Sequence, residues 1–186
     1  MLNIECEKKY LIQNLSTEKL KKLQKKNIQQ FYLNKEDKNL QKELLSVFKQ
    51  LPQNAAEIRV RIIDNKSAVL TLKSSGTKQR LELEQTIDLD LAKQLINNHA
   101  ISKIEKVRHI ITTPLLKLEI DLYKDRTLCV AELEFNPEDF TEAEIDEFVK
   151  NCLTKLDKNV KIIDVTENKN YKNSHLALPL SKNYVI

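Results

Sequence analysis

Charged and apolar side chains alternate along several short segments of this chain, and this alternation limits the possible folds more than any other feature. In the segment 4–10, Glu5, Glu7 and Lys9 lie on one face of an extended strand, and mainly apolar side chains lie on the other. Neighbouring carboxylates repel each other unless a cation lies between them. One such strand is unusual, and several together would indicate a site for charged partners.

Seven predicted strands share this pattern. Their polar face carries Glu5, Glu7, Lys9, Glu57, Arg59, Arg61, Thr71, Lys73, Arg80, Glu82, Glu84, Lys106, Arg108, Lys117, Glu119, Asp121, Glu132 and Glu134. The simplest interpretation is a sheet with one solvated face and one buried face. A wide twisted sheet tends to curl or close, however, and closure would place the apolar face outside, against amphipathic helices. The charged face would then line a lumen that calls for ligands.

The remaining patterns complete a fold of mainly antiparallel strands with several helices. Two further strands are predicted over residues 27–33 and 160–165, and amphipathic helices over 34–50 and 88–100. A short helix begins near Ser16, and another begins at Thr141 with a capping box to Glu144. With no linker or internal repeat, we predict one domain over residues 1–186.

Composition excludes several function classes. The single glycine, Gly76, cannot build a phosphate-cradling loop or a dinucleotide fingerprint, so phosphate would have to be bound by side chains. A net charge of +4 mixes both signs and argues against a nucleic-acid binder. The three cysteines are far apart and lack metal or redox spacing, which fits a reducing cytoplasm. No signal peptide or membrane-spanning apolar run is present, so we expect no membrane association.

The charges of the polar face indicate the kind of ligand. The carboxylate pairs Glu5/Glu7 and Glu132/Glu134 suit a hard divalent cation such as Mg²⁺ or Mn²⁺. Six basic side chains suit phosphate oxygens: Lys9, Arg59, Arg61, Lys73, Lys106 and Arg108. Both sets in one cavity predict a polyphosphate chain bound together with metal, and attack of water on a terminal phosphoryl group.

These residues resemble the CYTH superfamily, whose members are also called triphosphate tunnel metalloenzymes. The segment Glu5-Cys6-Glu7-Lys8-Lys9 is similar to the N-terminal E-x-E-x-K signature of that family. The resemblance continues in the family's order through Arg59-Val60-Arg61, Lys73, Arg80-x-Glu82-x-Glu84, Lys106-x-Arg108, Glu119-x-Asp121 and Glu132-x-Glu134. It covers nearly the whole chain.

The resemblance implies an α+β fold, namely a closed eight-stranded antiparallel β-barrel with a charged lumen and helices packed outside. The lumen would hold a triphosphate and one or two Mg²⁺ or Mn²⁺ ions. The implied metal ligands are Glu5, Glu7, Asp121, Glu132 and Glu134, and the implied catalytic residues are Glu5, Glu7 and Lys9. The implied substrate-binding residues are Lys9, Arg59, Arg61, Lys73, Arg80, Glu82, Glu84, Lys106, Arg108 and Lys169.

The C-terminal stretch departs from the family pattern. Residues 165–177 match the frame V-T-x-D-x-R-Y-x-N-x-x-L-A of bacterial members, but Asn168 replaces the usual Asp and Asn170 replaces the usual Arg. Lys169 or Lys172 is expected to supply the missing cation. His175, like His99 and His109, is interpreted as a packed or surface residue.

We therefore expect a metal-dependent triphosphatase that converts inorganic tripolyphosphate to pyrophosphate and phosphate. Three alternatives stay open: a thiamine triphosphatase, a class IV adenylyl cyclase that makes cyclic AMP from ATP, and a polyphosphate-binding module without turnover. The expected partner is a small-molecule triphosphate, with neither nucleic acid nor membrane. The sequence leaves open whether the protein forms a homodimer.

Overall fold

The computed structural model describes residues 3–48, 55–74, 79–181 and 184–186, and for residues 3–5 and 79–81 it describes the backbone only. Its strands are β1 (Asn3–Gln13), β2 (Gln24–Leu33), β3 (Glu57–Ile63), β4 (Ser67–Lys73), β5 (Gln79–Ile87), β6 (Ala100–Thr112), β7 (Lys117–Tyr123), β8 (Cys129–Phe135), β9 (Lys161–Asp164) and β10 (Leu178–Pro179). Its helices are α1 (Thr17–Leu20), α2 (Lys38–Val47), α3 (Leu89–His99), α4 (Glu142–Leu156), the 3₁₀ turn η1 (Lys169–Tyr171) and α5 (Asn173–Leu176).

The strands form one antiparallel sheet of ten strands, and the predicted closed barrel of eight strands is wrong. The strand order is β10-β6-β2-β3-β4-β5-β1-β8-β7, with β9 paired to β1 off this path and a further pairing between β6 and β7. The sheet is therefore not a single ring of eight strands, because β10 pairs with one end of β6 and β9 branches from one end of β1. Strands β1 and β6 are long, and one edge of each pairs with two different strands, one at each end. The residue pattern did not predict this double pairing.

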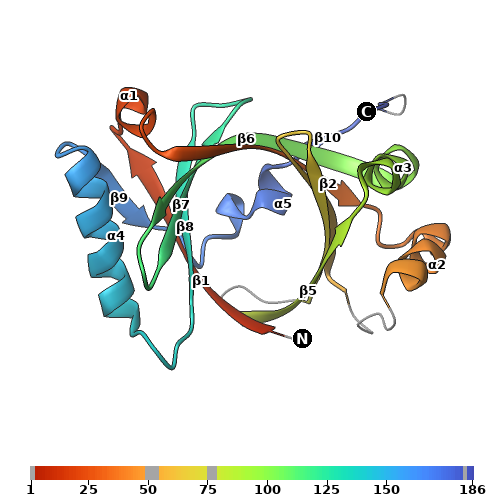
Figure 1. Cartoon of the computed structure of the whole chain (residues 1–186), viewed down its shortest axis with the longest axis horizontal. Coiled ribbons are helices and arrows are strands. Elements are labelled where there is room, and N and C mark those ends of the chain that lie inside the picture. The colour runs from red at the N-terminus through yellow and green to blue at the C-terminus, as the bar shows by residue number, and fades with distance from the viewer. Residues whose placement is uncertain (1–2, 49–54, 75–78, 182–183) are drawn as a thin grey trace.

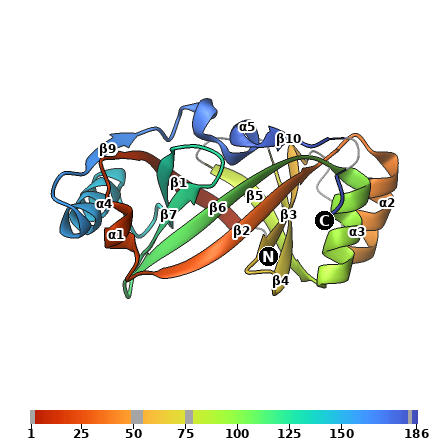
Figure 2. The same ribbon diagram turned by 90° about the horizontal axis from the view of Figure 1, so that it is seen from above.

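The sheet curls into a tunnel-like shape, with helices on its outside (Figure 1). Helices α2 and α3 lie on one side of the tunnel and α4 lies on the other, with α1 near the end of α4. The C-terminal stretch with η1 and α5 crosses one end of the tunnel, as the views along and across the tunnel both show (Figures 1 and 2). Segments far apart in the sequence thus meet around one central space.

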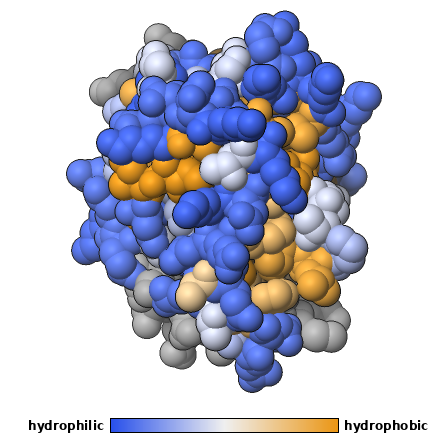
Figure 3. Space-filling model, turned by 90° about the vertical axis from the view of Figure 1, so that its left-hand side faces the viewer, coloured by the Kyte–Doolittle hydropathy of each residue, from blue (hydrophilic) through white to orange (hydrophobic). Residues whose placement is uncertain are grey.

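Two apolar cores lie between the outer face of the sheet and the helices. In the first, Leu70 of β4 is fully buried with Leu40 of α2 and Leu95 of α3. In the second, Leu118 of β7 is buried with Val149 of α4. Each core buries the apolar residues of strands that alternate with charged ones, and this burial drives the sheet to turn its charged face inward. The side of the molecule formed by α1, α4 and β9 is mainly hydrophilic with apolar patches between the polar ones (Figure 3).

The helix ends follow the local sequence signals. Asp37 caps α2, and its Oδ1 accepts a hydrogen bond from the backbone N–H of Asn39 at 2.8 Å. At the start of α4 the predicted capping box between Thr141 and Glu144 is confirmed. None of the helices among the described residues has the length and apolar character needed to cross a membrane.

Lys8 interrupts the apolar face of β1, and the structure explains this exception. Its ammonium lies 3.0 Å from Asp164 of β9 and also pairs with Asp146 of α4, whose Oδ1 accepts a hydrogen bond from the Tyr10 hydroxyl at 2.6 Å. The Lys8 side chain is 4% exposed. These contacts tie β9 and α4 to the outside of β1, so the opposite face of the strand, with Glu7 and Lys9, is held toward the interior.

Candidate functional site

The interior of the curled sheet contains a cavity of about 340 Å³. Its walls come from β1, β2, β3, β4, β6 and β8 and from the C-terminal stretch around η1 and α5. Most of the lining side chains are charged or polar: Glu7, Lys9, Tyr32, Glu57, Arg59, Arg61, Lys73, Ser74, Arg108, Glu132, Glu134, Lys169, Lys172, Asn173, Ser174 and His175. This composition suits a multiply charged ligand rather than an apolar one.

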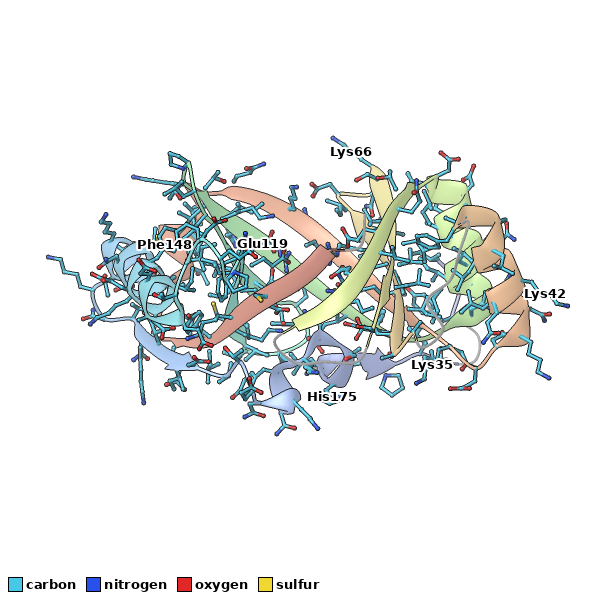
Figure 4. The ribbon with its side chains drawn as sticks, turned by 90° about the horizontal axis from the view of Figure 1, so that it is seen from below. Lys35, Lys42, Lys66, Glu119, Phe148 and His175 are labelled. Carbon is cyan, nitrogen blue, oxygen red and sulfur yellow. The ribbon has the colours of Figure 1, made fainter. Side chains whose placement is uncertain are left out.

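On one side of the cavity the charges neutralise each other. We call Lys106, Arg108, Glu119, Asp121 and Glu132 the paired cluster. Arg108 donates to Asp121 at 2.8 Å (Nε) and 2.7 Å (Nη2), to Glu132 at 3.0 Å, and also pairs with Glu119. Lys106 pairs with Asp121, and neither of these two side chains is more than 1% exposed. In the view with side chains, Glu119 lies in the interior, whereas Lys42 and Lys66 extend from the periphery (Figure 4).

The protonation states of the paired cluster follow from these contacts. Burial alone would raise the pKa of Asp121 and of Glu132. The positive charges of Arg108 and Lys106 outweigh burial for Asp121, and Lys9 adds to them for Glu132, so both pKa values lie below the ordinary carboxyl range. Both carboxylates are therefore ionised at neutral pH.

Lys9 joins this cluster to β1. Its ammonium lies 3.0 Å from Glu7 and 2.9 Å from Glu132, on neighbouring strands. Burial alone would lower the pKa of Lys9, but attraction by Glu132 and Glu7 outweighs it and raises the pKa. The E-x-E-x-K segment thus places an ammonium between two carboxylates, which is the arrangement that prevents like-charge repulsion.

The opposite side of the cavity is less completely neutralised. We call Arg59 and Arg61 of β3 the arginine bank. Arg59 donates to Glu82 of β5 at 3.1 Å, and Lys73 of β4 pairs with the same carboxylate at 2.5 Å. Arg59 also lies 3.6 Å from Glu84 and 4.0 Å from Glu57, so the incomplete neutralisation of this side concerns Arg61. The Nε of Arg59 is buried and lacks a hydrogen-bond partner in the described part of the chain.

Arg61 differs from the other cations of the wall. Among the described residues, no ion pair or hydrogen bond engages its side chain, and its Nε is buried without a partner. Burial and the positive charges of Arg59 and Arg108 together lower the pKa of Arg61 to about 10, and attraction by the more distant carboxylates Glu84 and Glu119 offsets only part of this effect. A guanidinium that remains charged at neutral pH, faces a cavity and lacks a counter-ion is an anion-binding group.

The structure brings together most of the predicted site residues. Those that line the cavity are Glu7, Lys9, Arg59, Arg61, Lys73, Arg108, Glu132, Glu134 and Lys169. Four others do not line the cavity but contact residues that do: Glu82, Glu84, Lys106 and Asp121. Glu5 and Arg80 are cross-strand partners on β1 and β5, and their side chains lie outside the described part of the structure.

Seven further lining residues were not predicted to bind substrate or metal: Tyr32, Ala56, Glu57, Ser74, Asn173, Ser174 and His175. Tyr32 of β2 lines the cavity next to the arginine bank, and its strand pairs with β3 at Arg59. The alternation of β2 could have indicated Tyr32, because Gln30 and Tyr32 occupy one face of a strand rich in β-forming residues. Three of them lie on the C-terminal stretch, where no periodicity indicates an orientation: Asn173, Ser174 and His175. Lys172, beside them, was expected as an alternative source of the missing cation, and it also lines the cavity.

The carboxylates of the cavity have the chemistry that a hard divalent cation requires. Glu7, Glu132 and Glu134 lie on the neighbouring strands β1 and β8 and supply oxygen ligands to one cavity. The donor set therefore fits Mg²⁺ or Mn²⁺. In the described part of the chain, no three His, Cys, Asp or Glu side chains already form a metal-binding group, because Lys9 lies between Glu7 and Glu132. Asp121 is fully buried against two cations and does not reach the cavity.

Comparison with known proteins places this site in a family. The CYTH domain model matches residues 3–161, which include both sides of the cavity except the C-terminal stretch. The chain belongs to the CYTH family. The resemblance that the ordered charge pattern indicated is thereby confirmed. No curated protein sequence matches the chain.

Solved structures show the same fold. A structure described as the hypothetical protein NE1496 is 24% identical, with a TM-score of 0.51 over 93% of this chain and 97% of its own. PH1819 from Pyrococcus horikoshii is 18% identical, with a TM-score of 0.51 over 86% of this chain and 93% of its own. A protein described as a putative adenylate cyclase from Bacillus halodurans is 18% identical, with a TM-score of 0.53 over 83% of this chain and 90% of its own. The CYTH fold is thus tunnel-like in this chain too.

Proposed function

We propose that this CYTH protein hydrolyses a triphosphate, with inorganic tripolyphosphate as the leading substrate and pyrophosphate and phosphate as products. The observation that carries the proposal is the arginine bank, where Arg61 lacks a counter-ion among the described residues and Arg59 has a free Nε. An unneutralised guanidinium in a cavity is costly unless an anion binds there. The family match supports a triphosphate as that anion.

The lining residues divide into groups with different tasks. Arg59, Arg61 and Lys73 approach from β3 and β4 and would hold phosphate oxygens, since guanidinium and ammonium groups donate strong charge-assisted hydrogen bonds. Arg108 projects from the opposite wall with its guanidinium fixed by Asp121 and Glu132. A chain of phosphates between the two walls would be oriented from both sides, and the charge that develops on the leaving pyrophosphate would be stabilised.

Glu7, Glu132 and Glu134 would hold Mg²⁺ or Mn²⁺, with Glu5 as a further candidate from the sequence. When bound, the ion supplies charge neutralisation and activation of water at the phosphoryl group. The residues of the chain supply the rest. Lys9 lies between Glu7 and Glu132 and offsets the repulsion of their charges, and the low exposure of both side chains, 11% each, limits water around the ligand.

The experiment that tests the proposal is a substrate panel with the purified full chain. Tripolyphosphate, thiamine triphosphate and ATP are each incubated with Mg²⁺ or Mn²⁺, and both released phosphate and cyclic AMP are measured. We expect metal-dependent phosphate release, fastest from tripolyphosphate. Cyclic AMP from ATP without phosphate release from tripolyphosphate would contradict the proposal and favour the cyclase, the activity that the Bacillus halodurans structure is named for.

Two further results complete the test. Glu7→Gln removes a carboxylate while keeping the shape of the side chain, so we expect loss of metal-dependent turnover with an unchanged fold by circular dichroism. A rise in melting temperature with tripolyphosphate and metal, but without product, would instead identify a binding module without turnover.

A further inference from the structure

The C-terminal stretch is the one wall of the cavity that does not come from the sheet. We call residues 169–176, which include η1 and α5, the cap. The cap crosses one end of the tunnel, and five of its residues line the cavity (Figures 1 and 2). It lies beyond residue 161, where the family match ends. The frame of this stretch resembles that of bacterial family members, but Lys172 and His175 occupy positions that the frame leaves open.

Side-chain contacts hold the cap in place against three strands. Asn173 accepts a hydrogen bond from the Tyr123 hydroxyl of β7 at 2.7 Å and donates one to Glu132 of β8 at 3.2 Å. Lys106 of β6 also donates to Asn173, at 3.5 Å. At the far end of α5, Arg126 donates to the backbone carbonyl of Leu176 at 2.7 Å. The cap is thus docked on the paired cluster, and its lining side chains have defined positions.

The cap presents hydrogen-bond donors and positive charge, whereas the rest of the wall mixes both signs. Residues 169–175 contain no Asp or Glu, and those that line the cavity are Lys169, Lys172, Asn173, Ser174 and His175. Four carboxylates of the described residues line the same cavity, Glu7, Glu57, Glu132 and Glu134, and Glu132 accepts a hydrogen bond from Asn173 of the cap. Glu7 and Glu132 are both held by Lys9. The cap end of the cavity therefore suits the most highly charged part of an anion.

His175 adds a donor that depends on its protonation. Its Nδ1 lies 2.6 Å from the backbone carbonyl oxygen of Lys169. A carbonyl oxygen only accepts, so Nδ1 carries a proton and Nε2 is the nitrogen left for a ligand. A fully ionised phosphate also only accepts, so Nε2 can bind it only in the protonated imidazolium form.

We propose that the cap is the recognition site for the free, unesterified end of the phosphate chain, with Lys172 and His175 as the residues that bind the terminal phosphate. An unesterified terminal phosphate carries one more ionisable oxygen than an internal or esterified phosphate, so it gains most from a wall of donors. The substrate class is then a linear polyphosphate with at least one free end. This inference rests on the proposed function and adds to it the orientation of the substrate in the tunnel.

The test compares His175→Gln, Lys172→Gln and the control Lys66→Gln, which removes an exposed charge on the other side of the molecule (Figure 4). Binding of tripolyphosphate is measured by calorimetry without added metal, at about pH 6 and about pH 8. The ratio of each variant's Kd to the wild-type Kd at the same pH cancels the titration of tripolyphosphate itself. Diadenosine triphosphate, which is esterified at both ends, is the second probe.

We expect His175→Gln to weaken tripolyphosphate binding by up to about fivefold, and more at about pH 6 than at about pH 8, because the protonated fraction of any histidine falls as the pH rises. Lys172→Gln should weaken binding at both pH values, and Lys66→Gln at neither. Diadenosine triphosphate should bind the wild type and His175→Gln equally.

Equal tripolyphosphate affinity of wild type and His175→Gln at both pH values would overturn the cap inference and leave the proposed function intact. An equal loss of diadenosine triphosphate binding would overturn it as well, because His175 would then not distinguish a free end. Wild-type protein that fails to bind tripolyphosphate at either pH would instead overturn the proposed function, and the cap inference with it.

Discussion

The two sides of the cavity wall contain similar residues in different electrostatic states. In the paired cluster, Arg108 contacts three carboxylates and Lys106 is buried against Asp121. In the arginine bank, Arg59 shares Glu82 with Lys73, and Arg61 has no counter-ion among the described residues. The charges of the paired cluster are therefore neutralised without a ligand, whereas the charge of Arg61 in the arginine bank is not.

This difference separates two tasks that a charged lumen must perform. Buried ions that are fully paired and hydrogen-bonded fix the geometry of the wall, although their net contribution to stability is small. A buried ion without a partner lowers the free energy of unfolding of the protein. A ligand of opposite charge that binds to this ion raises the free energy of unfolding again. The following predictions test this division, beginning with the largest expected effect.

Asp121→Asn should destabilise the protein most. The substitution keeps the shape of the side chain but leaves Lys106 and Arg108 buried with less negative charge, so we expect a loss of about 3–5 kcal/mol in the free energy of unfolding. Urea denaturation at pH 7 measures this change. A loss below about 1 kcal/mol would show that the paired cluster does not depend on its central carboxylate.

Glu132→Gln should change how the free energy of unfolding depends on pH in the acidic range. Lys9, Lys106 and Arg108 outweigh the effect of burial and hold the pKa of Glu132 well below its ordinary value. The stabilising contribution of Glu132 is therefore fully present above the carboxyl pKa of the unfolded chain, about 4.3, and is lost as the pH falls from there through the folded-state pKa. We expect the free energy of unfolding to fall less steeply below about pH 5 in Glu132→Gln than in the wild type. Parallel curves from thermal unfolding between pH 7 and 2 would contradict this assignment.

Arg61→Met should stabilise the protein without ligand. Because burial lowers the pKa of Arg61 to about 10, its charge opposes folding at every pH below that value. An apolar side chain of similar length removes this cost, and we expect a gain of about 1–2 kcal/mol that is constant between about pH 6 and 9 and declines at higher pH. Urea denaturation at several pH values checks both the sign and the pH range. Destabilisation of the variant would mean that Arg61 is already neutralised.

The smallest effect is expected for an ion pair outside the cavity. Lys21, directly after α1, and Glu18 of α1 lie 2.7 Å apart, with both side chains 70% exposed. Lys21→Gln should change the free energy of unfolding by less than about 0.5 kcal/mol, because solvent screens this pair. Thermal unfolding of this variant in low and high salt provides the baseline for the three buried substitutions above. A loss of more than about 1 kcal/mol would show that exposed pairs of this chain do more than ordinary surface pairs.

Much of the wall could be predicted from the sequence because strand alternation has a period of two. The alternation assigned Glu7, Lys9, Arg59 and Arg61 to one face, and the apolar partners of these residues decided which face turns toward the helices. The same reasoning did not give the number or order of strands. Pairing is set by long-range contacts, and the short strands β9 and β10 carry too few residues to show a pattern.

The sequence also did not distinguish the paired cations from the unpaired one. Arg59 and Arg61 occupy equivalent positions two residues apart on β3, and only the register with β4 and β5 places Glu82 beside Arg59. His175 was interpreted as a packed or surface residue because the three histidines are not clustered in the sequence. The orientation of the cap depends on Asn173 and Arg126, whose partners lie about 40 to 70 residues away in the chain.

The most direct test of the division between the two sides is the melting temperature of wild type and Arg61→Met with and without saturating tripolyphosphate. An anion that completes the arginine bank should raise the melting temperature of the wild type, since a ligand that binds only the folded state stabilises it. We predict that Arg61→Met melts higher than the wild type without ligand and gains less than half of the wild-type shift with it. Equal shifts for the two proteins would show that Arg61 is not where the phosphate chain binds.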